Sequence, residues 1–156
     1  MGRFIAILMV FFGGVLLTTV AAADDVDDIK KATLEHLATL NAGDAAGHVQ
    51  HHLPVYSGFD AGGGLLESYD SLEDQKNNLK ALFDSGVKVN FQLRHLEVKV
   101  YGNAAIVTGY MVGTVTSPDG TIQQVTNRRT AVLIKQAGQW REVHLHTSPL
   151  ITAPSQ

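Results

Sequence analysis

The sequence predicts an α+β domain in which a strongly curved antiparallel sheet wraps over helices to form a cone with an open end. Two observations predict this class. Apolar residues at helical spacing are confined to the first half of the chain, whereas period-two alternation dominates from Val87 onward. Segregated helices and antiparallel strands are typical of α+β folds. Because pockets form readily in the mouth of such a cone, a ligand site is expected there.

The N-terminus has the pattern of a signal peptide. Arg3 precedes an almost unbroken apolar run over residues 4–17, and Ala21-Ala22-Ala23 follows as a small-x-small cleavage site. The run is shorter than the roughly 20 residues of a membrane span. We therefore expect a signal peptide over residues 1–23, a domain over 24–150 and a tail over 151–156. The protein would be exported, periplasmic or secreted, with no membrane contact after cleavage.

Composition restricts the class of partner. The chain of 156 residues has no cysteine and a formal net charge of −3. Mild acidity argues against nucleic acid, which requires a clustered basic face. An exported chain without cysteine has no disulfide framework, so its stability must come from a packed core.

Three helices are predicted before the long strands. An acidic stretch, residues 24–28, should begin a helix that ends near Asn41, with Gly43 as its left-handed stop. Asp44 can cap a short helix over 45–52. Ser71 and Asp74 form a capping box for a helix over 72–85 that ends at Gly86. The residues expected to be buried by the first and third helices are Ile29, Thr33, Leu34, Leu37, Leu40, Leu72, Leu79, Leu82 and Phe83.

The predicted strands are residues 55–60, 87–101 with a bulge or bend, 104–116, and a final hairpin over 121–148 that turns at Ala137-Gly138-Gln139. Gly62-Gly63-Gly64 predicts a loop after the first strand. Simple alternation along the last strand assigns two faces. Val143, Leu145 and Thr147 share one, and Trp140, Glu142, His144 and His146 share the other.

The region from Gly102 to Ser148 resembles SnoaL-like domains of the nuclear-transport-factor-2-like superfamily and the association domain of calcium/calmodulin-dependent kinase. The resemblance is carried by Thr130-x-Val132 and by Gly138-x-Trp140-x-x-Val143-His144-x-His146-x-Ser148. The order of elements extends it over about Val26 to Ser148. It implies a curved-sheet cone, a pocket between sheet and helices, and a homodimer through the outer sheet face. The superfamily contains both enzymes and non-catalytic modules, so the fold does not give the function.

One departure from the kinase association domain affects the ligand class. That domain has arginines in its pocket, and an ungapped alignment places them at Met111, Ala131 and Thr147 of this chain. A carboxylate-binding pocket of that kind is therefore not expected here. The residues expected to line the pocket are Met111, Arg129, Ala131, Leu133, Val143, Leu145 and Thr147, with Tyr110 at the rim. Arg129 would orient an anionic or polar ligand if it points inward, and would be a solvated charge if it points outward.

Histidines raise the question of a metal. His144 and His146 flank one residue on a strand, so their rings share a face and could share a metal. The resembled association domain carries the same pair, which favours a structural role. His48, His51 and His52 fall at i, i+3 and i+4, on one face if this segment is helical. Together with His144 and His146 they could build a three-histidine site, but we expect them at the surface or at a rim. No metal and no cofactor are expected.

Catalytic candidates are weak. An isomerase needs a carboxylate base and a phenol or protonated acid that holds an enolate, and Asp60 with Tyr56 is the best available pair. Residues four apart on a strand stand about 13 Å apart, so only a bend could bring them together. Two hypotheses follow. The first is an exported module that binds a small apolar or mildly polar molecule or assembles with itself. The second is a lyase or isomerase that acts on a hydrophobic carbonyl compound.

Overall fold

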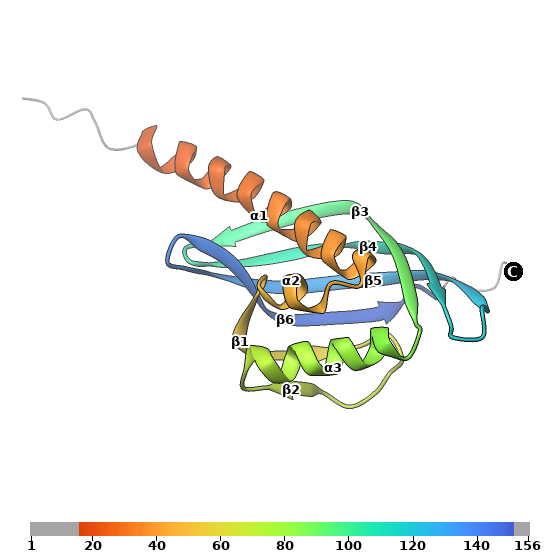
Figure 1. The fold of residues 1–156 in the computed structure, drawn as a ribbon. Helices are drawn as coiled ribbons and strands as arrows, with labels where there is room; N and C mark the ends of the chain where they lie inside the picture. The colour runs from red at the N-terminus through yellow and green to blue at the C-terminus, as the bar shows by residue number, and fades with distance from the viewer. Residues whose placement is uncertain (1–15, 152–156) are drawn as a thin grey trace, which may run out of the picture.

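The structure, a computed structural model, describes residues 16–151 and is an α+β fold built on one curved six-stranded sheet (Figure 1). The helices are α1 (Leu16–Ala42), α2 (Ala45–Val49) and α3 (Leu72–Asp84). The strands are β1 (His52–Phe59), β2 (Glu67–Tyr69), β3 (Lys88–Tyr101), β4 (Ala104–Thr116), β5 (Ile122–Gln136) and β6 (Gln139–Pro149). Their order in the sheet is β2-β1-β6-β5-β4-β3. The predicted fold class is confirmed.

The sheet is mixed rather than purely antiparallel. Strand β1 pairs parallel to β6, so an early strand lies beside the last one, and β2 adds an antiparallel edge. The sequence did not predict β2, because three residues are too few to show a period. Pro54 lies in β1 where the pairing with β6 is irregular, between His52 and Ser57. Proline has no backbone N–H, so it is tolerated at such an irregularity.

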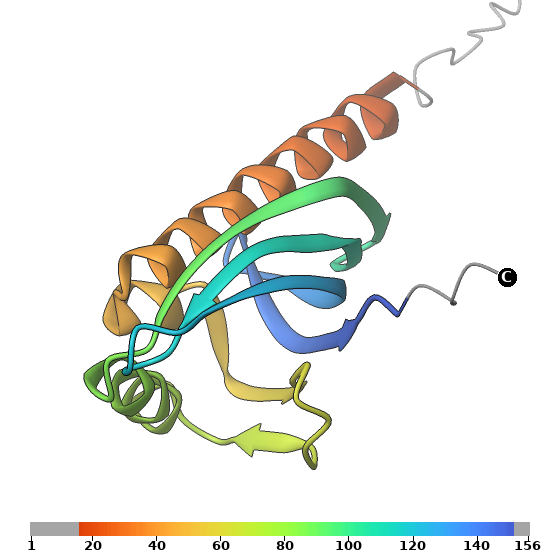
Figure 2. The same ribbon diagram turned by 90° about the vertical axis from the view of Figure 1, so that its right-hand side faces the viewer.

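Helix α1 crosses the inner side of the sheet (Figure 2). It begins at Leu16, earlier than the acidic residues suggested, and ends at Ala42. The φ of 69° at the following residue, Gly43, confirms the left-handed stop. Its buried face carries Ile29, Thr33 and His36, at i, i+4 and i+7. Leu34 is 52% exposed, so its predicted burial is wrong. Within residues 16–151 no helix combines the length and the apolar character needed to cross a bilayer.

Residues 1–15 lie outside the described part of the chain, as do 152–156 in the predicted tail. The predicted signal peptide over 1–23 and its cleavage after Ala23 therefore stay predictions. The folded domain itself includes Asp25, whose carboxylate accepts hydrogen bonds from the Lys135 ammonium at 2.5 Å and from the Trp140 indole at 3.1 Å.

Local capping fixes the two short helices. The backbone N–H of Gly47 donates to the Asp44 carboxylate at 2.8 Å, which caps α2 as predicted. The backbone N–H of Asp74 donates to the Ser71 hydroxyl at 3.1 Å, which confirms the capping box of α3. Helix α3 contacts α2, β1 and β2. Because it covers only this edge of the sheet, Leu82 is 45% exposed and its predicted burial is wrong.

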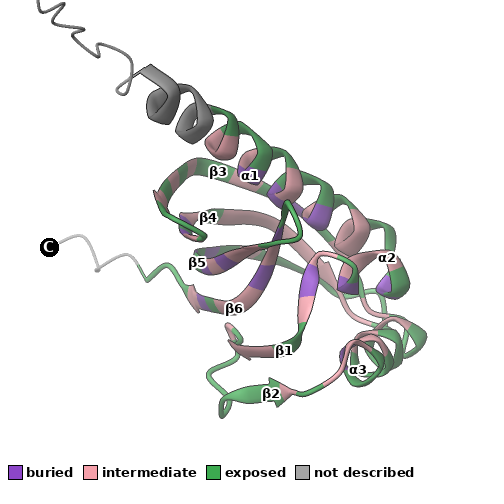
Figure 3. Ribbon diagram, turned by 90° about the vertical axis from the view of Figure 1, so that its left-hand side faces the viewer, coloured by how far each residue is buried: buried purple, intermediate pink, exposed green. Residues whose placement is uncertain are grey.

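The hydrophobic core lies between α1 and the inner face of the sheet, where Figure 3 shows the buried stretches. Its members are Ile29, Ala105, Val107, Ala131, Leu133 and Trp140. Strand β3 bends at His95, which has a φ of 51° next to a register shift, and this confirms the predicted bulge. Ala137 and Gly138 both have positive φ, as a two-residue hairpin turn of type I′ requires.

Candidate functional site

A bulge in β6 decides which of its side chains point inward. Leu133 pairs with Glu142, but the preceding residue Val132 pairs with His144, so Val143 is an extra residue. Directly opposite residues in an antiparallel pair share a face. Glu142 therefore points inward with Leu133. The two-face assignment made from simple alternation is wrong here, because one extra residue reverses every side chain beyond it. Trp140 and Glu142 join Leu145 and Thr147, and His144 and His146 lie on the outer face.

The inward turn of Glu142 creates a buried ion pair. Glu142 is 3% exposed and Arg129, on β5, is 7% exposed. The Nη2 of Arg129 donates to Oε2 of Glu142, and the Tyr56 hydroxyl donates to Oε1 at 3.1 Å. Among the described residues, Nη1 of Arg129 has no hydrogen-bond partner. Of the two orientations left open by the sequence, the structure has Arg129 inward, where its charge is paired with Glu142.

Three histidine rings meet beside this ion pair. They come from different elements, His36 from α1, His48 from α2 and His52 from the first residue of β1. The Nε2 of His36 lies 2.8 Å from Nε2 of His48 and 2.9 Å from Nε2 of His52. The ligand atoms of the three rings lie within 4.8 Å of one another, so this set could hold a metal ion. We call these residues the histidine triad.

The outer nitrogens of two triad rings are held by polar partners. The Nδ1 of His52 lies 2.7 Å from Oε1 of Gln75, and the Gln75 amide nitrogen donates to the carbonyls of Leu53 and Pro54 at 3.0 and 2.9 Å. The Nδ1 of His48 lies 3.2 Å from the Thr39 hydroxyl. The Nδ1 of His36 lies 3.7 Å from Oε2 of Glu142, which is a longer, electrostatic contact.

Burial keeps these groups uncharged. It lowers the pKa of His36 well below its ordinary value, with the neighbouring His48 adding to the effect. Burial also lowers the pKa of His48 to about 3 and, partly opposed by Glu142, lowers that of His52. The pKa of Tyr56 is raised well above its ordinary value by burial and by the Glu142 charge. Near neutral pH the site therefore presents neutral imidazoles and a protonated phenol around one carboxylate.

A cavity of about 160 Å³ opens beside the triad, between α2, α3, β1 and β2. Both His48 and His52 line it, and the Tyr56 ring, stacked on His52 with centroids 4.1 Å apart, forms part of the same wall. Val49 and Leu79 supply apolar surface. The remaining lining residues are Glu67, Tyr69, Gln75 and Asn78. The cavity thus has a polar wall at the triad and an apolar wall on the helices.

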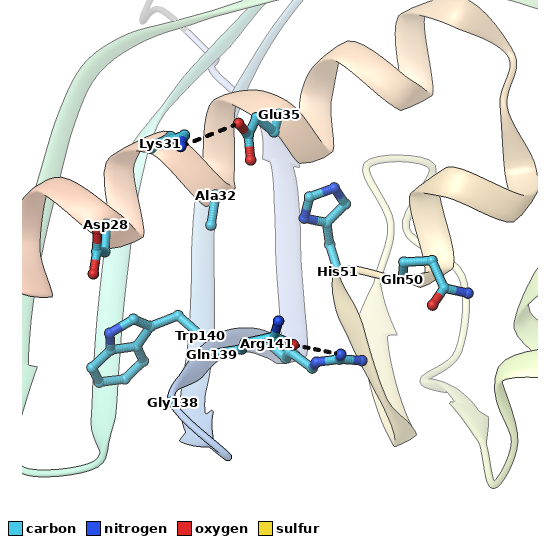
Figure 4. Close-up of a pocket in the computed structure, with 10 residues that line it drawn as sticks. All are labelled: Asp28, Lys31, Ala32, Glu35, Gln50, His51, Gly138, Gln139, Trp140 and Arg141. Carbon is cyan, nitrogen blue, oxygen red and sulfur yellow. Dashed lines mark hydrogen bonds and ion pairs between the residues drawn. The ribbon is translucent and has the colours of Figure 1, made fainter.

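A second hollow of about 380 Å³ lies between α1 and the turn of the β5–β6 hairpin (Figure 4). Its polar side chains are satisfied within the chain or face solvent. Lys31 pairs with Glu35 at 3.9 Å, and Arg141 donates to Gln139 at 2.8 Å. His51 borders this hollow and stacks on His36, with ring centroids 5.3 Å apart. The hollow therefore lies next to the triad across the His51 ring, but none of the three triad residues lines it.

The structure does not bring Asp60 and Tyr56 together. The Asp60 carboxylate is exposed and accepts a hydrogen bond from the backbone N–H of Gly62 in the following loop. Tyr56 instead points toward Glu142. The prediction that His48 and His52 lie at the surface or rim is wrong, because His52 is 5% exposed and His48 is half-buried within the triad.

The residues predicted to line the pocket separate into three groups. Ala131 and Leu133 belong to the core under α1, and Leu145 packs against it. Arg129 and Thr147 are buried, and Met111 faces the same side because it pairs with buried Asn127. Val143 lines a groove beside β1, and Tyr110 alternates onto the outer face. None of these residues lines the cavity beside the triad.

The strand histidines have outer-face partners. The Nδ1 of His144 lies 2.9 Å from the Ser57 hydroxyl, and both His144 and His146 make edge contacts with the ring of Phe59. These contacts show that His144 and His146 pack where β1 and β6 meet.

Sequence reasoning missed His36, Gln75 and Glu142 as site residues. His36 had a detectable signal, because it continues the buried spacing of Ile29 and Thr33 along α1. Glu142 could not be found without the bulge. In the sequence, Gln75 is indistinguishable from an exposed polar residue of a helix. Its role depends on the carbonyls of Leu53 and Pro54 in β1, which accept hydrogen bonds from its amide nitrogen.

Comparisons with known proteins agree with the fold. The profile of the SnoaL-like domain matches residues 29–152. No curated protein matches the chain. Three solved structures illustrate the likeness. A ketosteroid isomerase-like protein from Erwinia carotovora atroseptica is 16% identical, with a TM-score of 0.69 over 83% of this chain and 98% of that one. An NTF2-like protein of unknown function from Pseudomonas putida is 18% identical, with a TM-score of 0.69 over 85% of this chain and 91% of that one. The CaMKII hub of S. rosetta is 23% identical, with a TM-score of 0.63 over 80% of this chain and 96% of that one. Identities this low show a common fold alone.

Proposed function

This chain belongs to the SnoaL-like domain family, and on that premise we propose that it binds a small, mildly polar molecule in the cavity beside the histidine triad. The observation that carries the proposal is the cavity itself, whose wall is polar at His48, His52 and Tyr56 and apolar at Val49 and Leu79. Pockets of this kind, with few convergent polar groups on an apolar surface, are the usual form of small-molecule sites.

The volume limits the size of the ligand. A cavity of about 160 Å³ is close to the size of an apolar cavity known to hold benzene, on the order of 150 Å³. A single ring with one polar substituent fits this space. Its apolar part would contact Val49 and Leu79, and its polar group would face the imidazoles. Because the triad and Tyr56 are uncharged near neutral pH, a neutral polar group is favoured over a carboxylate.

A fragment screen followed by protein-observed NMR tests this. Single-ring phenols, alcohols and ketones should shift the methyl resonances of Val49 and Leu79 while those of Val143, in the neighbouring groove, stay in place. Leu79→Trp, which fills the cavity, should abolish the shifts. Leu82→Trp is the matched control on the same helix, because Leu82 is 45% exposed. Binding that survives Leu79→Trp, or a screen without any shift at Val49, would contradict the proposal.

A lyase or isomerase acting on a hydrophobic carbonyl compound is the second candidate. It is favoured by the Tyr56 phenol, which lines the cavity and is held neutral. If this hydroxyl turns from Glu142 toward the cavity, its single proton can be donated to a developing enolate oxygen. The test is deuterium exchange α to the carbonyl of a small cyclic ketone, on wild type and on Tyr56→Phe. Exchange at the uncatalysed rate in wild type would exclude this candidate.

Export and self-association complete the proposal. Export rests on the N-terminal pattern, and self-association rests on the outer sheet face, where Ile106 is 38% exposed and Val132 and Ile134 are half-buried in the single chain. The likeness to a CaMKII hub supports the second point. A face of this kind is stabilised when a second copy removes it from water.

A further inference from the structure

The tautomers of two triad histidines are fixed by groups that can only accept. The Gln75 amide uses its nitrogen to donate to two backbone carbonyls, of Leu53 and Pro54, so its oxygen is the atom that faces His52. An amide oxygen accepts only, and Nδ1 of His52 must therefore carry the proton. In the neutral ring the proton is then absent from Nε2.

The same logic applies to His48. The Thr39 hydroxyl donates its single proton to the backbone carbonyl of His36 at 2.7 Å, so only a lone pair remains for Nδ1 of His48 at 3.2 Å. His48 therefore carries its proton on Nδ1 and directs a bare Nε2 into the triad. Two nitrogen lone pairs, from His48 and His52, thus point at the Nε2 of His36 from 2.8 and 2.9 Å.

Such an arrangement favours a positive centre between the three nitrogens. With the His36 proton on Nδ1, which faces Glu142 at 3.7 Å, three lone pairs converge and repel one another. A proton on Nε2 of His36 would relieve part of this repulsion. This single N–H would, however, have to be shared between the Nε2 atoms of His48 and His52. A metal ion at the centre would bind all three nitrogens at once, and neutral Nε2 is a common metal ligand.

We propose that the Nε2 atoms of His36, His48 and His52 bind one divalent transition-metal ion of the zinc type, with a fourth coordination position open to the cavity. A tetrahedral ion with Zn–N bonds of roughly 2.0–2.1 Å separates its ligand nitrogens by roughly 3.3 Å. The Nε2 pairs at 2.8 and 2.9 Å need to move apart by about 0.5 Å, which small changes in side-chain torsions provide.

The surroundings fit a metal centre. Gln75 and Thr39 orient two ligands from behind, as outer partners do in metal sites. The Glu142 carboxylate lies on the Nδ1 side of the third ligand, His36. It also compensates the positive charge of Arg129, which without Glu142 would oppose the binding of a cation. Three protein ligands with an open position are typical of reactive rather than purely structural zinc sites. His48 and His52 line the cavity, so a water or a ligand atom can reach the fourth position from there. This inference runs against the expectation from sequence that no metal is bound. The preference for a neutral ligand given above applies to the metal-free triad, and a bound divalent ion would also attract an anionic group from the cavity.

Metal titration tests the proposal. Protein treated with a chelator and dialysed is titrated with Zn²⁺ by calorimetry and with Co²⁺ by visible absorption. We expect one ion per chain and the strong absorption of tetrahedral Co²⁺. His52→Gln should weaken binding more than about 100-fold, and Gln75→Leu about 10- to 100-fold. His144→Gln is the matched control and should bind as wild type does, because its ring lies on the outer face. Unchanged affinity in His52→Gln would overturn the assignment.

A measurement on wild type covers the case in which a variant does not fold. Long-range proton–nitrogen correlation spectra of the imidazoles report the tautomer of each ring. We expect His48 and His52 as Nδ1–H tautomers, and Zn²⁺ should shift the Nε2 resonances of all three triad rings but not those of His144 and His146. A triad that keeps a proton on Nε2 of His36 when Zn²⁺ is present at excess would overturn the proposal.

Discussion

The buried pair of Arg129 and Glu142 supports a quantitative prediction about stability. Glu142→Gln keeps the shape of the side chain and an oxygen for Tyr56, but it leaves a guanidinium that is 7% exposed without its anion. Removing one partner of a buried ion pair costs about 3–5 kcal/mol, because the other charge stays buried and uncompensated. A domain of this size is stable by about 5–15 kcal/mol, so the loss is a large share of the total.

Removing both charges should cost much less. In Arg129→Met/Glu142→Leu no charge is left, and replacing a buried pair with apolar groups is often close to neutral. The Tyr56 hydroxyl then lacks the acceptor it has at 3.1 Å, which costs about 1–3 kcal/mol. Adding Tyr56→Phe should recover most of that amount, so the triple variant should be more stable than the Glu142→Gln single variant.

Urea denaturation followed by tryptophan fluorescence measures these differences, because Trp140 is buried in the core. All variants are compared with chelator present, so that metal binding does not contribute. Glu97→Gln is the control, since Glu97 is exposed on β3 and a surface change of this kind stays within about 0.5 kcal/mol. A loss below about 1 kcal/mol in Glu142→Gln, or a double variant as unstable as the sum of the single variants, would refute the reasoning.

Three further predictions concern the ends and the surface of the domain. Hydrogen bonds from Lys135 and, to a smaller extent, from Trp140 lower the folded pKa of Asp25 below its ordinary value of 3.8. The stability that the Asp25 carboxylate contributes is therefore present above pH 3.8 and is lost as the pH falls through the lower folded pKa. Asp25→Asn should flatten the acid side of the plot of unfolding free energy against pH, and an unchanged plot would exclude this role. Exported protein should have the intact mass of Asp24–Gln156, and a mass that retains Met1 would contradict cleavage. Val132→Trp should shift sedimentation from dimer toward monomer with the unfolding midpoint largely kept, whereas a wild-type monomer at high micromolar concentration would rule out the dimer.

Residues whose role depends on local chemistry could be predicted from the sequence. Asp44 and Ser71 cap their helices, and Gly43 ends α1, because each acts on backbone groups within four positions. Period-two alternation also located the four long strands within a few residues of their ends. These signals need no knowledge of distant parts of the chain.

The site could not be predicted in the same way, because its geometry depends on one irregular residue and on pairing across the chain. The bulge at Val143 turns Glu142 inward, and nothing in the alternation of β6 marks where it falls. His52 was placed on a helix with His48, whereas the chain leaves α2 at Val49 and enters β1. His36 joins them only because α1 lies across the sheet.

The position of β6 between β1 and β5 has a consequence for how the protein folds. Within residues 16–151, β6 is the last strand, yet it connects β1 to the rest of the sheet. Contacts between residues this distant in sequence form late and slow folding, since a long loop must close first. Glu142 lies on that strand, so its ion pair with Arg129 forms only after β6 has joined the sheet. A ribosome-bound or partly translocated chain therefore contains all three histidines before it contains the site.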